Sequence, residues 1–381
     1  MKTDKVVDGE MSDVLLIANH SPQMRQLLKR VALEEIPVSE DLFSPEQLDS
    51  YLNDLGEPPL SLIAVGDIML AGRTKKVIAE HGADYPFEAV LPIFKRSPIV
   101  LGNLEGPFAT KTLREERNFS YAVNPRLATS LTRAGINVVT LANNHLLDCG
   151  RTGVRETLDA LALAGVASVG AGVNKKAAHE PVILQADHLR IGLLGYYWNR
   201  RTAATRDLPG SAMDPPEVLE ADISGLRTKV DRVVITFHWG VPYEREPSTE
   251  DRAKARFAID CGADAVIGHH PHIIQPFEIY RDCPIFYSIG NFAFGSGNSH
   301  AEGLLVGLRF EESQTVVYAY PLYAKNRDQR VHYQPKVLRG KGAEQVLYRL
   351  VEISGPSGER LQVDNARASL TLPWLRPSKK E

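Results

Sequence analysis

The segment ADAVIGHHPH, residues 263–272, passes from an apolar run directly into three histidines within four positions. The whole chain has 11 histidines in 381 residues, so a chance cluster of this density is a poor explanation. The apolar part, Ala265–Ile267, is typical of a buried strand. Imidazoles that directly follow a strand are typical of metal ligands at the rim of a sheet. The segment therefore predicts a sheet-based fold with a metal-binding loop at a strand end.

Strand-like and helix-like stretches alternate from residue 60 onward. The predicted strands are Ser61–Val65, Ile99–Gly102, Val138–Ala142, Val166–Val169, Ile191–Gly195, Val233–Phe237, Ala265–Ile267, Ile285–Ile289, Leu304–Phe310 and Val316–Tyr320. The predicted helices are Pro45–Leu55, Thr74–Glu80, Pro125–Ala134, Thr152–Ala164, Thr249–Cys261 and Ala343–Ile353. This alternation predicts a layered α/β fold. The late strands have no helices between them, so we expect an antiparallel portion after about Pro284 and a polar tail after the last helix.

Composition and charge exclude several functional classes. The net charge is −3, from 44 basic and 47 acidic residues, so nothing drives the chain toward nucleic acid or an anionic membrane. Three scattered cysteines form neither a disulfide framework nor a Cys-x-x-Cys metal site. No run approaches the roughly 18 apolar residues that cross a bilayer, and the N-terminus has no secretory apolar region. We expect a cytoplasmic protein without an integral membrane segment and without a nucleic-acid partner.

Five polar clusters directly follow strand-like runs. They are Gly66-Asp67, Gly102–Pro107, Asn143–Asp148, His238–Gly240 and Gly268–His272. Ligands of open α/β sheets bind outside the carboxyl ends of the strands, so the five clusters are expected to converge at one sheet edge. Their Asp, Glu, Asn and His side chains suit Mn²⁺, Fe²⁺ or Zn²⁺, and the lack of cysteine disfavours a structural zinc site.

Each cluster also has a purely structural interpretation. Asp67 could cap a helix, Asn143 and Asn144 could shape a turn, and His238 could be a core histidine. Five such coincidences at strand ends are harder to explain than one shared site.

Taken in order, these motifs resemble the poly-γ-glutamate capsule biosynthesis proteins of the CapA type, a family similar to the calcineurin-like metallophosphoesterases. The matching stretches are Gly66–Leu70, Asn103–Gly106, Ala142–His145 with Asp148, His238–Gly240, His269–His272 with Gln275, and Tyr287–Phe292. The resemblance implies a four-layered α/β/β/α sandwich of metallophosphoesterase type over residues 60–325. Residues 1–57 are then an N-terminal extension or small appended unit, and residues 326–381 a C-terminal extension packed on the main domain.

The resemblance also implies roles for individual residues. The implied ligands of one or two divalent ions (Mn, Fe or Zn) are Asp67, Glu105, Asn144, His238, His270 and His272. His145 would be the catalytic histidine, and Asp148 at i+3 would orient its imidazole. One departure is notable, because Met69 stands where the phosphoesterases have the histidine of Asp-x-His. One metal would then lack a nitrogen ligand, which makes His269 a possible additional ligand.

The resulting interpretation is a metal-dependent hydrolase, in which the metal activates water and polarises a phosphoester or an amide carbonyl. Two alternatives stay open. The same centre could acidify an α-carbon proton in a peptide or amino-acid epimerase, or the protein could be a non-catalytic accessory of poly-γ-glutamate synthesis or export. The expected substrate is a small molecule, a peptide or an anionic polymer. Candidate substrate-binding residues are Tyr121, Tyr197 and Arg200.

Overall fold

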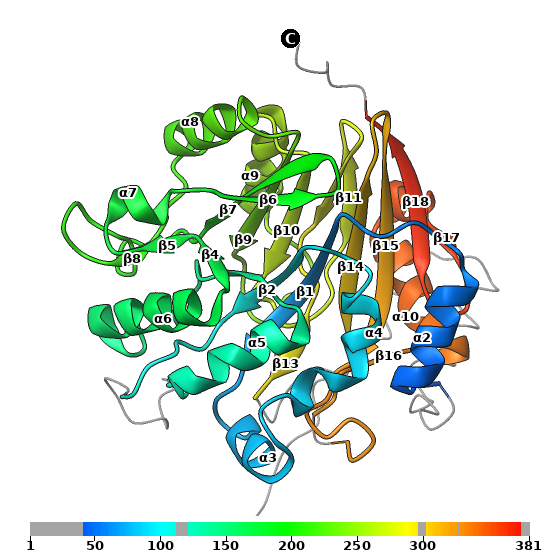
Figure 1. Cartoon of the computed structure of the whole chain (residues 1–381). Helices are drawn as coiled ribbons and strands as arrows, with labels where there is room; N and C mark the ends of the chain where they lie inside the picture. Colours follow the sequence, from blue (N-terminus) through cyan, green and yellow to red (C-terminus); the bar gives the residue numbers. More distant parts are fainter. Residues whose placement is uncertain (1–40, 112–120, 296–301, 327, 375–381) are drawn as a thin grey trace, which may run out of the picture.

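Two β-sheets lie face to face at the centre of the fold (Figure 1). The computed structural model describes residues 41–111, 121–295, 302–326 and 328–374. In the ten-stranded sheet the order is β17-β18-β15-β14-β1-β2-β3-β4, with β13 beside β1 and β16 beside β15. In the six-stranded sheet the order is β11-β12-β10-β9-β7-β6, and a small third sheet pairs β5 with β8.

The strands of the two large sheets have the following bounds. The ten-stranded sheet contains β1 Leu62–Met69, β2 Val100–Leu104, β3 Val138–Thr140, β4 Ala167–Val169, β13 Asn291–Phe294, β14 Glu302–Phe310, β15 Gln314–Tyr323, β16 Lys336–Val337, β17 Gln362–Val363 and β18 Ala368–Pro373. The six-stranded sheet contains β6 Val182–Ala186, β7 Leu189–Tyr196, β9 Arg232–His238, β10 Ala265–His269, β11 Phe277–Tyr280 and β12 Cys283–Phe286. The small sheet is β5 Ala171–Gly172 with β8 Gly210–Ser211.

Three apolar cores separate the four layers. The first lies between the ten-stranded sheet and the helical segments on its outer face, which are α2 Pro45–Asp54, α3 Thr74–His81, η2 Tyr85–Val90, α4 Leu91–Phe94, η4 Pro125–Leu127, α5 Ala128–Ala134 and α6 Gly150–Ala164. The second lies between the two sheets and continues under α10 Gly340–Ile353, which α11 Gly355–Gly358 follows. The third lies between the six-stranded sheet and α8 Pro216–Arg227 and α9 Thr249–Asp260. The predicted four-layered α/β/β/α sandwich is confirmed.

The sequence patterns located most of these elements. Each of the ten predicted strands and six predicted helices overlaps an observed element, and the antiparallel pairing of β14 with β15 is confirmed. The expected polar tail is wrong, because β18 pairs with β15 along Gln314–Ala319 and closes the large sheet. Residues 1–40 lie outside the described part of the chain, and the division into segments 1–57, 60–325 and 326–381 stays a prediction.

Across the described residues, the helices are all too short or too polar to cross a bilayer.

An ion pair joins the segment before β1 to the segment before β18. The guanidinium of Arg367 donates to both carboxylate oxygens of Glu57, at 2.7 and 2.8 Å, and the Arg367 side chain is only 8% exposed. Hydrogen bonds from Arg367 outweigh burial and hold the pKa of Glu57 below its ordinary value. A carboxylate with a depressed pKa stabilises the folded state above its unfolded pKa and loses that effect as the pH falls through the folded value.

We therefore expect Glu57→Gln to lower the free energy of unfolding at pH 7 by about 1–2 kcal/mol, after allowance for the partial exposure of Glu57. The difference from the unsubstituted protein should shrink as the pH falls below the ordinary Glu pKa. Urea unfolding at several pH values measures it. A difference that is constant from pH 7 to pH 3 would contradict the ionic origin of this contribution.

Candidate metal centre

The predicted site residues come from strand ends in both large sheets. Asp67 lies in β1 and is in register with Asn103 of β2, in the ten-stranded sheet. His238 and His269 are the last residues of β9 and β10 and are in register in the six-stranded sheet. The expectation of one sheet edge is corrected in this respect, since the clusters meet where the edges of two packed sheets adjoin. Asp67 also lies inside its strand, because β1 continues to Met69 by pairing with β13.

Glycines allow the backbones to approach closely beside this cluster. A Cβ on Gly66 would lie 2.0 Å from the carbonyl oxygen of Gly290, and the neighbouring Asp67 N–H donates to that same oxygen at 3.2 Å. A Cβ on Gly268 would likewise lie 2.0 Å from the carbonyl oxygen of Tyr287. Only glycine fits at these two positions, which place Asp67 and His269 at the junction of the sheets.

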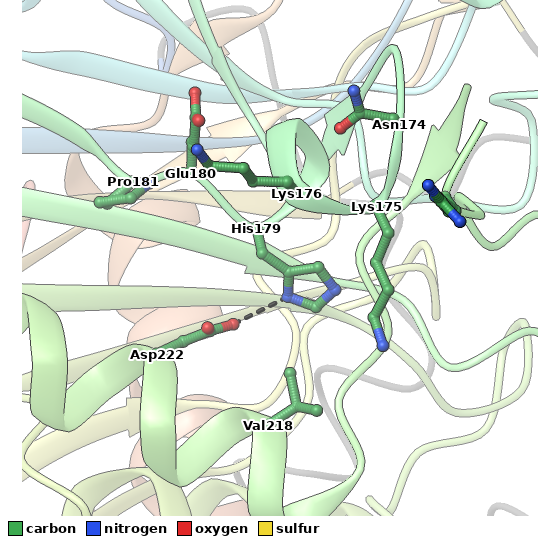
Figure 2. Close-up of a pocket in the computed structure, with 9 residues that line it drawn as sticks. Asn174, Lys175, Lys176, His179, Glu180, Pro181, Val218 and Asp222 are labelled. Atoms are coloured by element: carbon green, nitrogen blue, oxygen red, sulfur yellow. Dashed lines mark hydrogen bonds and ion pairs between the residues drawn. The ribbon is translucent and has the colours of Figure 1, made fainter. Parts of the chain in front are cut away.

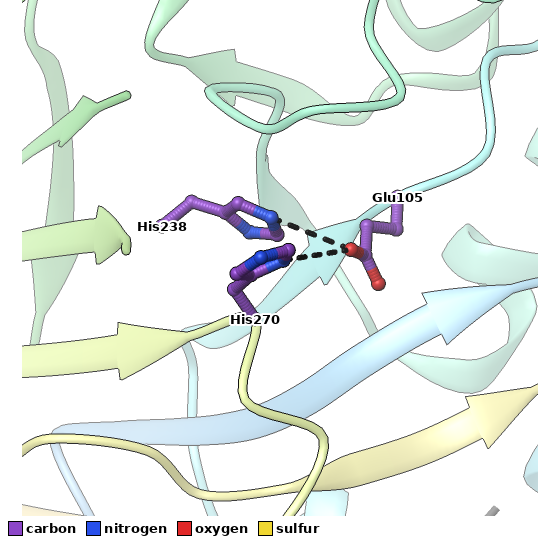
Figure 3. Close-up of side chains that lie close together, drawn as sticks. All are labelled: Glu105, His238 and His270. Atoms are coloured by element: carbon purple, nitrogen blue, oxygen red, sulfur yellow. Dashed lines mark ion pairs between the residues drawn. The ribbon is translucent and has the colours of Figure 1, made fainter. Parts of the chain in front are cut away.

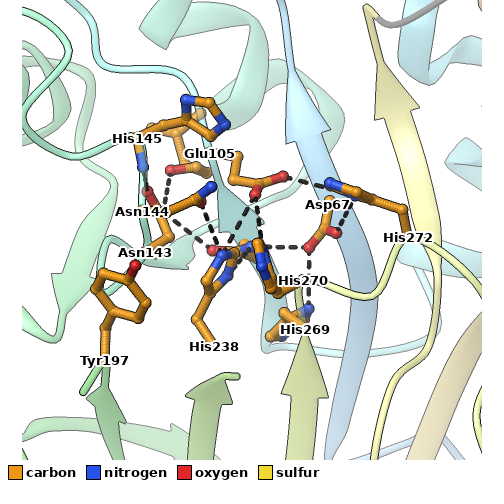
Figure 4. Close-up of polar contacts among 12 residues, drawn as sticks. Asp67, Glu105, Asn143, Asn144, His145, Tyr197, His238, His269, His270 and His272 are labelled. Atoms are coloured by element: carbon orange, nitrogen blue, oxygen red, sulfur yellow. Dashed lines mark hydrogen bonds and ion pairs between the residues drawn. The ribbon is translucent and has the colours of Figure 1, made fainter. Parts of the chain in front are cut away.

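Two fully buried carboxylates form the centre of the cluster (Figure 4). Oδ1 of Asp67 accepts a hydrogen bond from Asn103 Nδ2 at 2.7 Å, and Oδ2 lies 3.0 Å from His272 Nδ1. Oε1 of Glu105 lies 3.4 Å from His238 Nε2 and 4.0 Å from His270 Nδ1. Oε2 of Glu105 lies 4.0 Å from His272 Nδ1. Glu105 is thus shared between two sets of imidazoles.

Several of these buried atoms have no hydrogen-bond partner among the described residues. They are Oδ2 of Asp67, both carboxylate oxygens of Glu105, both ring nitrogens of His269, and Nδ1 of His270. Unpaired buried carboxylates are costly, because burial removes the water that would solvate them. Two three-residue groups within this set could hold a metal ion, namely Glu105–His238–His270 (Figure 3) and Asp67–Glu105–His272. The donor atoms in each group all lie within 4.8 Å of one another, so the residues fit a divalent cation.

Asparagine side chains orient the ligand candidates. Asn103 Nδ2 lies 3.2 Å from His238 Nδ1, and Asn144 Oδ1 lies 2.9 Å from His238 Nε2. An amide N–H facing Nδ1 makes that nitrogen an acceptor, so the ring proton belongs on Nε2, between Asn144 and Glu105. A metal ion bound there would replace this proton.

The histidines differ in their affinity for protons. Burial, followed by the nearby His270, holds the pKa of His238 well below its ordinary value. Burial also disfavours the charged form of His272, but the carboxylates of Glu105 and Asp67 outweigh it and raise the pKa of His272 to about 9. Burial similarly opposes the charged form of Asp67, yet the adjacent imidazoles of His269 and His272 leave its pKa well below the ordinary value.

The loop after β10 has an unusual backbone. His270 and His272 have φ values of 99° and 58°, in the region that favours glycine. Residues other than glycine pay a free-energy cost there, and such residues gather at functional sites. The adjoining loop after β9 supports this conformation, since Tyr243 N–H donates to the Pro271 carbonyl at 2.8 Å and Tyr243 itself has a φ of 69°.

A separate histidine–carboxylate pair lies at the edge of the cluster. His145 Nδ1 lies 2.8 Å from Asp148 Oδ2, which also accepts the Tyr121 backbone N–H at 2.8 Å. The Tyr121 ring lies edge-on to His145 at 5.2 Å. Burial lowers the pKa of His145, but the Asp148 hydrogen bond and the Glu105 charge together raise it above the ordinary value. The contacts of the pair thus favour the protonated form of His145.

The structure brings nearly all the predicted site residues into this one region (Figure 4). Tyr197 lies with its ring edge-on to His238, at 5.4 Å between centroids. Arg200 is exposed, and its role in substrate binding stays a prediction. Met69 is 1% exposed and packs in the outer apolar core, so it offers no ligand.

Sequence reasoning did not assign three asparagines that hold the cluster together. Asn103 contacts both Asp67 and His238. Asn143 donates to Asn103 Oδ1 at 3.2 Å and accepts the His145 backbone N–H at 3.1 Å. Asn291 lies 2.9 Å from His272 Nδ1 through its Oδ1. All three stand inside the quoted motifs, but only Asn143 is next to a ligand candidate, Asn144, so that for it alone the sequence position was a signal.

Similarity to known proteins covers more than half of the chain. The family model described as "Bacterial capsule synthesis protein PGA_cap" matches residues 61–296. The chain is similar to the capsule biosynthesis protein CapA of Bacillus anthracis, with 35% identity over 248 residues, 62% of this chain and 60% of that protein. It is 32% identical over 264 residues to a probable polyglutamine synthesis accessory protein of Mycobacterium tuberculosis, covering 65% of this chain and 67% of that one. The chain thus spans less than two thirds of the length of the Bacillus relative.

Among solved structures, a 5′-nucleotidase precursor from Thermus thermophilus matches with a TM-score of 0.42 and 15% identity, over 66% of this chain and 51% of that one. The motif-based resemblance to the capsule synthesis proteins is confirmed by the family match.

The close approach at Gly66 gives a testable consequence. We expect Gly66→Ala to lower the free energy of unfolding by about 3 kcal/mol, because the added Cβ forces β1 away from Gly290. Gly225, inside α8 with open space around its Cβ position, is the matched control. Gly225→Ala should be neutral or stabilise by up to about 1 kcal/mol. Denaturant unfolding of both variants measures this, and equal effects would contradict the packing argument.

Proposed function

This chain belongs to the bacterial capsule synthesis protein PGA_cap family, and we propose that it is a metal-dependent hydrolase whose centre is the cluster around Glu105. The observation that carries the proposal is the set of buried, unpartnered donor atoms on Asp67, Glu105 and His270. A folded protein does not retain so many unsatisfied polar atoms at one point without a ligand to satisfy them. A divalent cation suits this mixture of carboxylate and imidazole donors.

In this proposal two groups of side chains hold one ion each. Glu105, His238 and His270 form the first group, and Asp67, Glu105 and His272 form the second. Asn144 is close enough to His238 Nε2 to contribute an amide oxygen to the first group. A bound divalent ion supplies Lewis-acid polarisation of the substrate oxygen and a more acidic water. His269 adjoins Asp67 Oδ1 at 3.5 Å and is an additional ligand candidate for the second group.

His145, oriented by Asp148, donates a proton to the leaving group. Asp148 accepts the Nδ1–H of His145 and thereby fixes the ring, so that the Nε2–H is the proton available for transfer. When the scissile bond breaks, this proton passes to the leaving oxygen or nitrogen, while water supplies the hydroxyl group that remains on the other product. The Asp148 hydrogen bond and the Glu105 charge raise the pKa of His145 against the effect of burial, which favours the protonated imidazole that this role requires.

The substrate class is an anionic or peptide-type molecule with a phosphoester or amide bond. The names of the relatives refer to capsule biosynthesis and polyglutamine synthesis, which supports a polymer-related role. Tyr197 and Tyr121 line the cluster from two sides, beside His238 and His145, and are candidates to contact the substrate.

A second candidate is an accessory function in which the centre binds an anionic polymer without turnover. The word "accessory" in the name of the Mycobacterium relative favours it. The two candidates differ in one outcome: both require a bound metal, but only the hydrolase loses a measurable rate when His145 is substituted.

The shared position of Glu105 predicts a pattern of metal loss. We expect Glu105→Gln to abolish binding of both ions, whereas His270→Gln and Asp67→Asn should each lower the metal content from about two ions per chain to about one. Elemental analysis after equilibration with Mn²⁺ or Zn²⁺ measures this. His188→Gln is the control, since His188 is exposed and, among the described residues, pairs with Asp187. Full metal content in the Glu105 variant would refute the assignment of the centre.

Proton donation by His145 should show in how strongly kcat depends on the leaving group. We expect His145→Gln to lower kcat by about 10²- to 10⁴-fold on a phenyl phosphodiester while leaving the metal content unchanged. The loss should be much smaller on the corresponding 4-nitrophenyl ester, because nitrophenolate departs without a proton. Asp148→Asn should show the same dependence on the leaving group with a smaller loss. An equal loss on both esters would indicate that His145 acts otherwise.

A further inference from the structure

A surface cavity lies between α7 (Lys175–Ala178) and α8 (Figure 2), and none of its lining residues is a candidate metal ligand. Its volume is about 640 Å³, within the range of small-molecule sites. Nothing in the proposed hydrolase uses it. Its lining consists mainly of charged side chains, so its ligand should be charged as well.

The charged groups around this cavity favour an anion. Lys175, Lys176 and Arg206 line it, against the carboxylates of Glu180 and Asp222. Asp222 is already engaged in hydrogen bonds within the protein. The three basic side chains outnumber the two carboxylates, so the net charge of the lining is positive before the imidazole of His179 is counted.

A chain of three side chains fixes His179 at the inner wall of the cavity. The hydroxyl of the buried Tyr196 donates to Asp222 Oδ2 at 3.0 Å, and His179 Nδ1 lies 2.8 Å from the same oxygen. The His179 side chain is 11% exposed. Because Asp222 and Tyr196 come from α8 and β7, two separate elements hold the imidazole in one orientation.

The other ring nitrogen of His179 is left available. In Figure 2 it points away from Asp222, toward the side on which the amine of Lys175 lies. Within the described ranges of the chain, Nε2 of His179 has no hydrogen-bond partner. An imidazole held by a carboxylate at Nδ1, with Nε2 facing a cavity lined by cations, is suited to donate a hydrogen bond to an anion.

We propose that this cavity is a binding site for a small anion that carries a carboxylate or a phosphate group. His179, protonated on both nitrogens, donates Nδ1–H to Asp222 and Nε2–H to an oxygen of the anion. Lys175 and Arg206 supply the remaining positive charge at the cavity wall. The residues of this site take no part in the proposed hydrolysis.

The experiment is a titration of the intact, ¹⁵N-histidine-labelled protein with inorganic phosphate and, separately, with glutarate. The His179 ring signals are assigned by their loss in His179→Asn, a variant that retains a donor near the Nδ1 position but removes Nε2. We expect a saturable shift of the Nε2 signal toward the doubly protonated form. Lys175→Ala should weaken the binding about tenfold, the effect of one charge-assisted hydrogen bond.

The matched control is Lys229→Ala, because Lys229 is an exposed lysine just beyond α8 and does not line the cavity. A response to glutarate alone identifies a carboxylate ligand, a response to phosphate alone identifies a phosphate ligand, and either supports the site. The proposal is overturned if the His179 signals respond to neither anion. It is also overturned if Lys229→Ala weakens binding as much as Lys175→Ala, since the effect would then be general surface charge.

Discussion

Two carboxylates with no solvent exposure, Asp67 and Glu105, impose the constraint on which the rest of the site depends. Burying a carboxylate is unfavourable unless opposite charge and hydrogen bonds compensate for the lost water. The surrounding histidines and Asn103 provide part of that compensation, but both oxygens of Glu105 still lack a hydrogen-bond partner among the described residues. This deficit is the reason that we propose a ligand site rather than a stabilising network for the cluster.

The compensation depends on the packing of two sheets. Asp67 and Asn103 are neighbours within the ten-stranded sheet, and His238 and His269 are neighbours within the six-stranded sheet. Each pair alone would be an ordinary feature of a strand end. Face-to-face packing of the sheets over a common apolar core brings the two pairs together, and Gly66 permits the close backbone approach of Gly290 beside Asp67. Stability of the fold and geometry of the site are therefore linked at the same residues.

The sequence predicted the elements well, because apolar runs such as Val233–Phe237 are buried on both faces and have no competing interpretation. The sequence predicted strands less well where strand pairing depends on residues that are distant in the chain. The strand Ala368–Pro373 was missed although its burial alternates as in a half-buried strand, because the polar residues around it hid a short segment that pairing with β15 stabilises. The ligand candidates were found through their residue types and a family resemblance. The roles of Asn103 and Asn291 depend on contacts across strands, which no local pattern encodes.

The two groups around Glu105 are not equivalent, and the difference follows from their existing contacts. His272 Nδ1 is hydrogen-bonded to Asn291 Oδ1 at 2.9 Å and lies 3.0 Å from Asp67 Oδ2, so a cation in that group must displace the proton shared with Asn291. His270 Nδ1 faces Glu105 with no hydrogen-bond partner in the described chain. Met69, packed into the outer core, adds no nitrogen donor to the Asp67 group. Each group gives up one imidazole proton when it binds an ion, at His238 Nε2 beside Asn144 or at His272 Nδ1 beside Asn291. The Glu105–His238–His270 group also offers a second imidazole nitrogen, on His270, that has no hydrogen-bond partner among the described residues, so that group should be the first to fill.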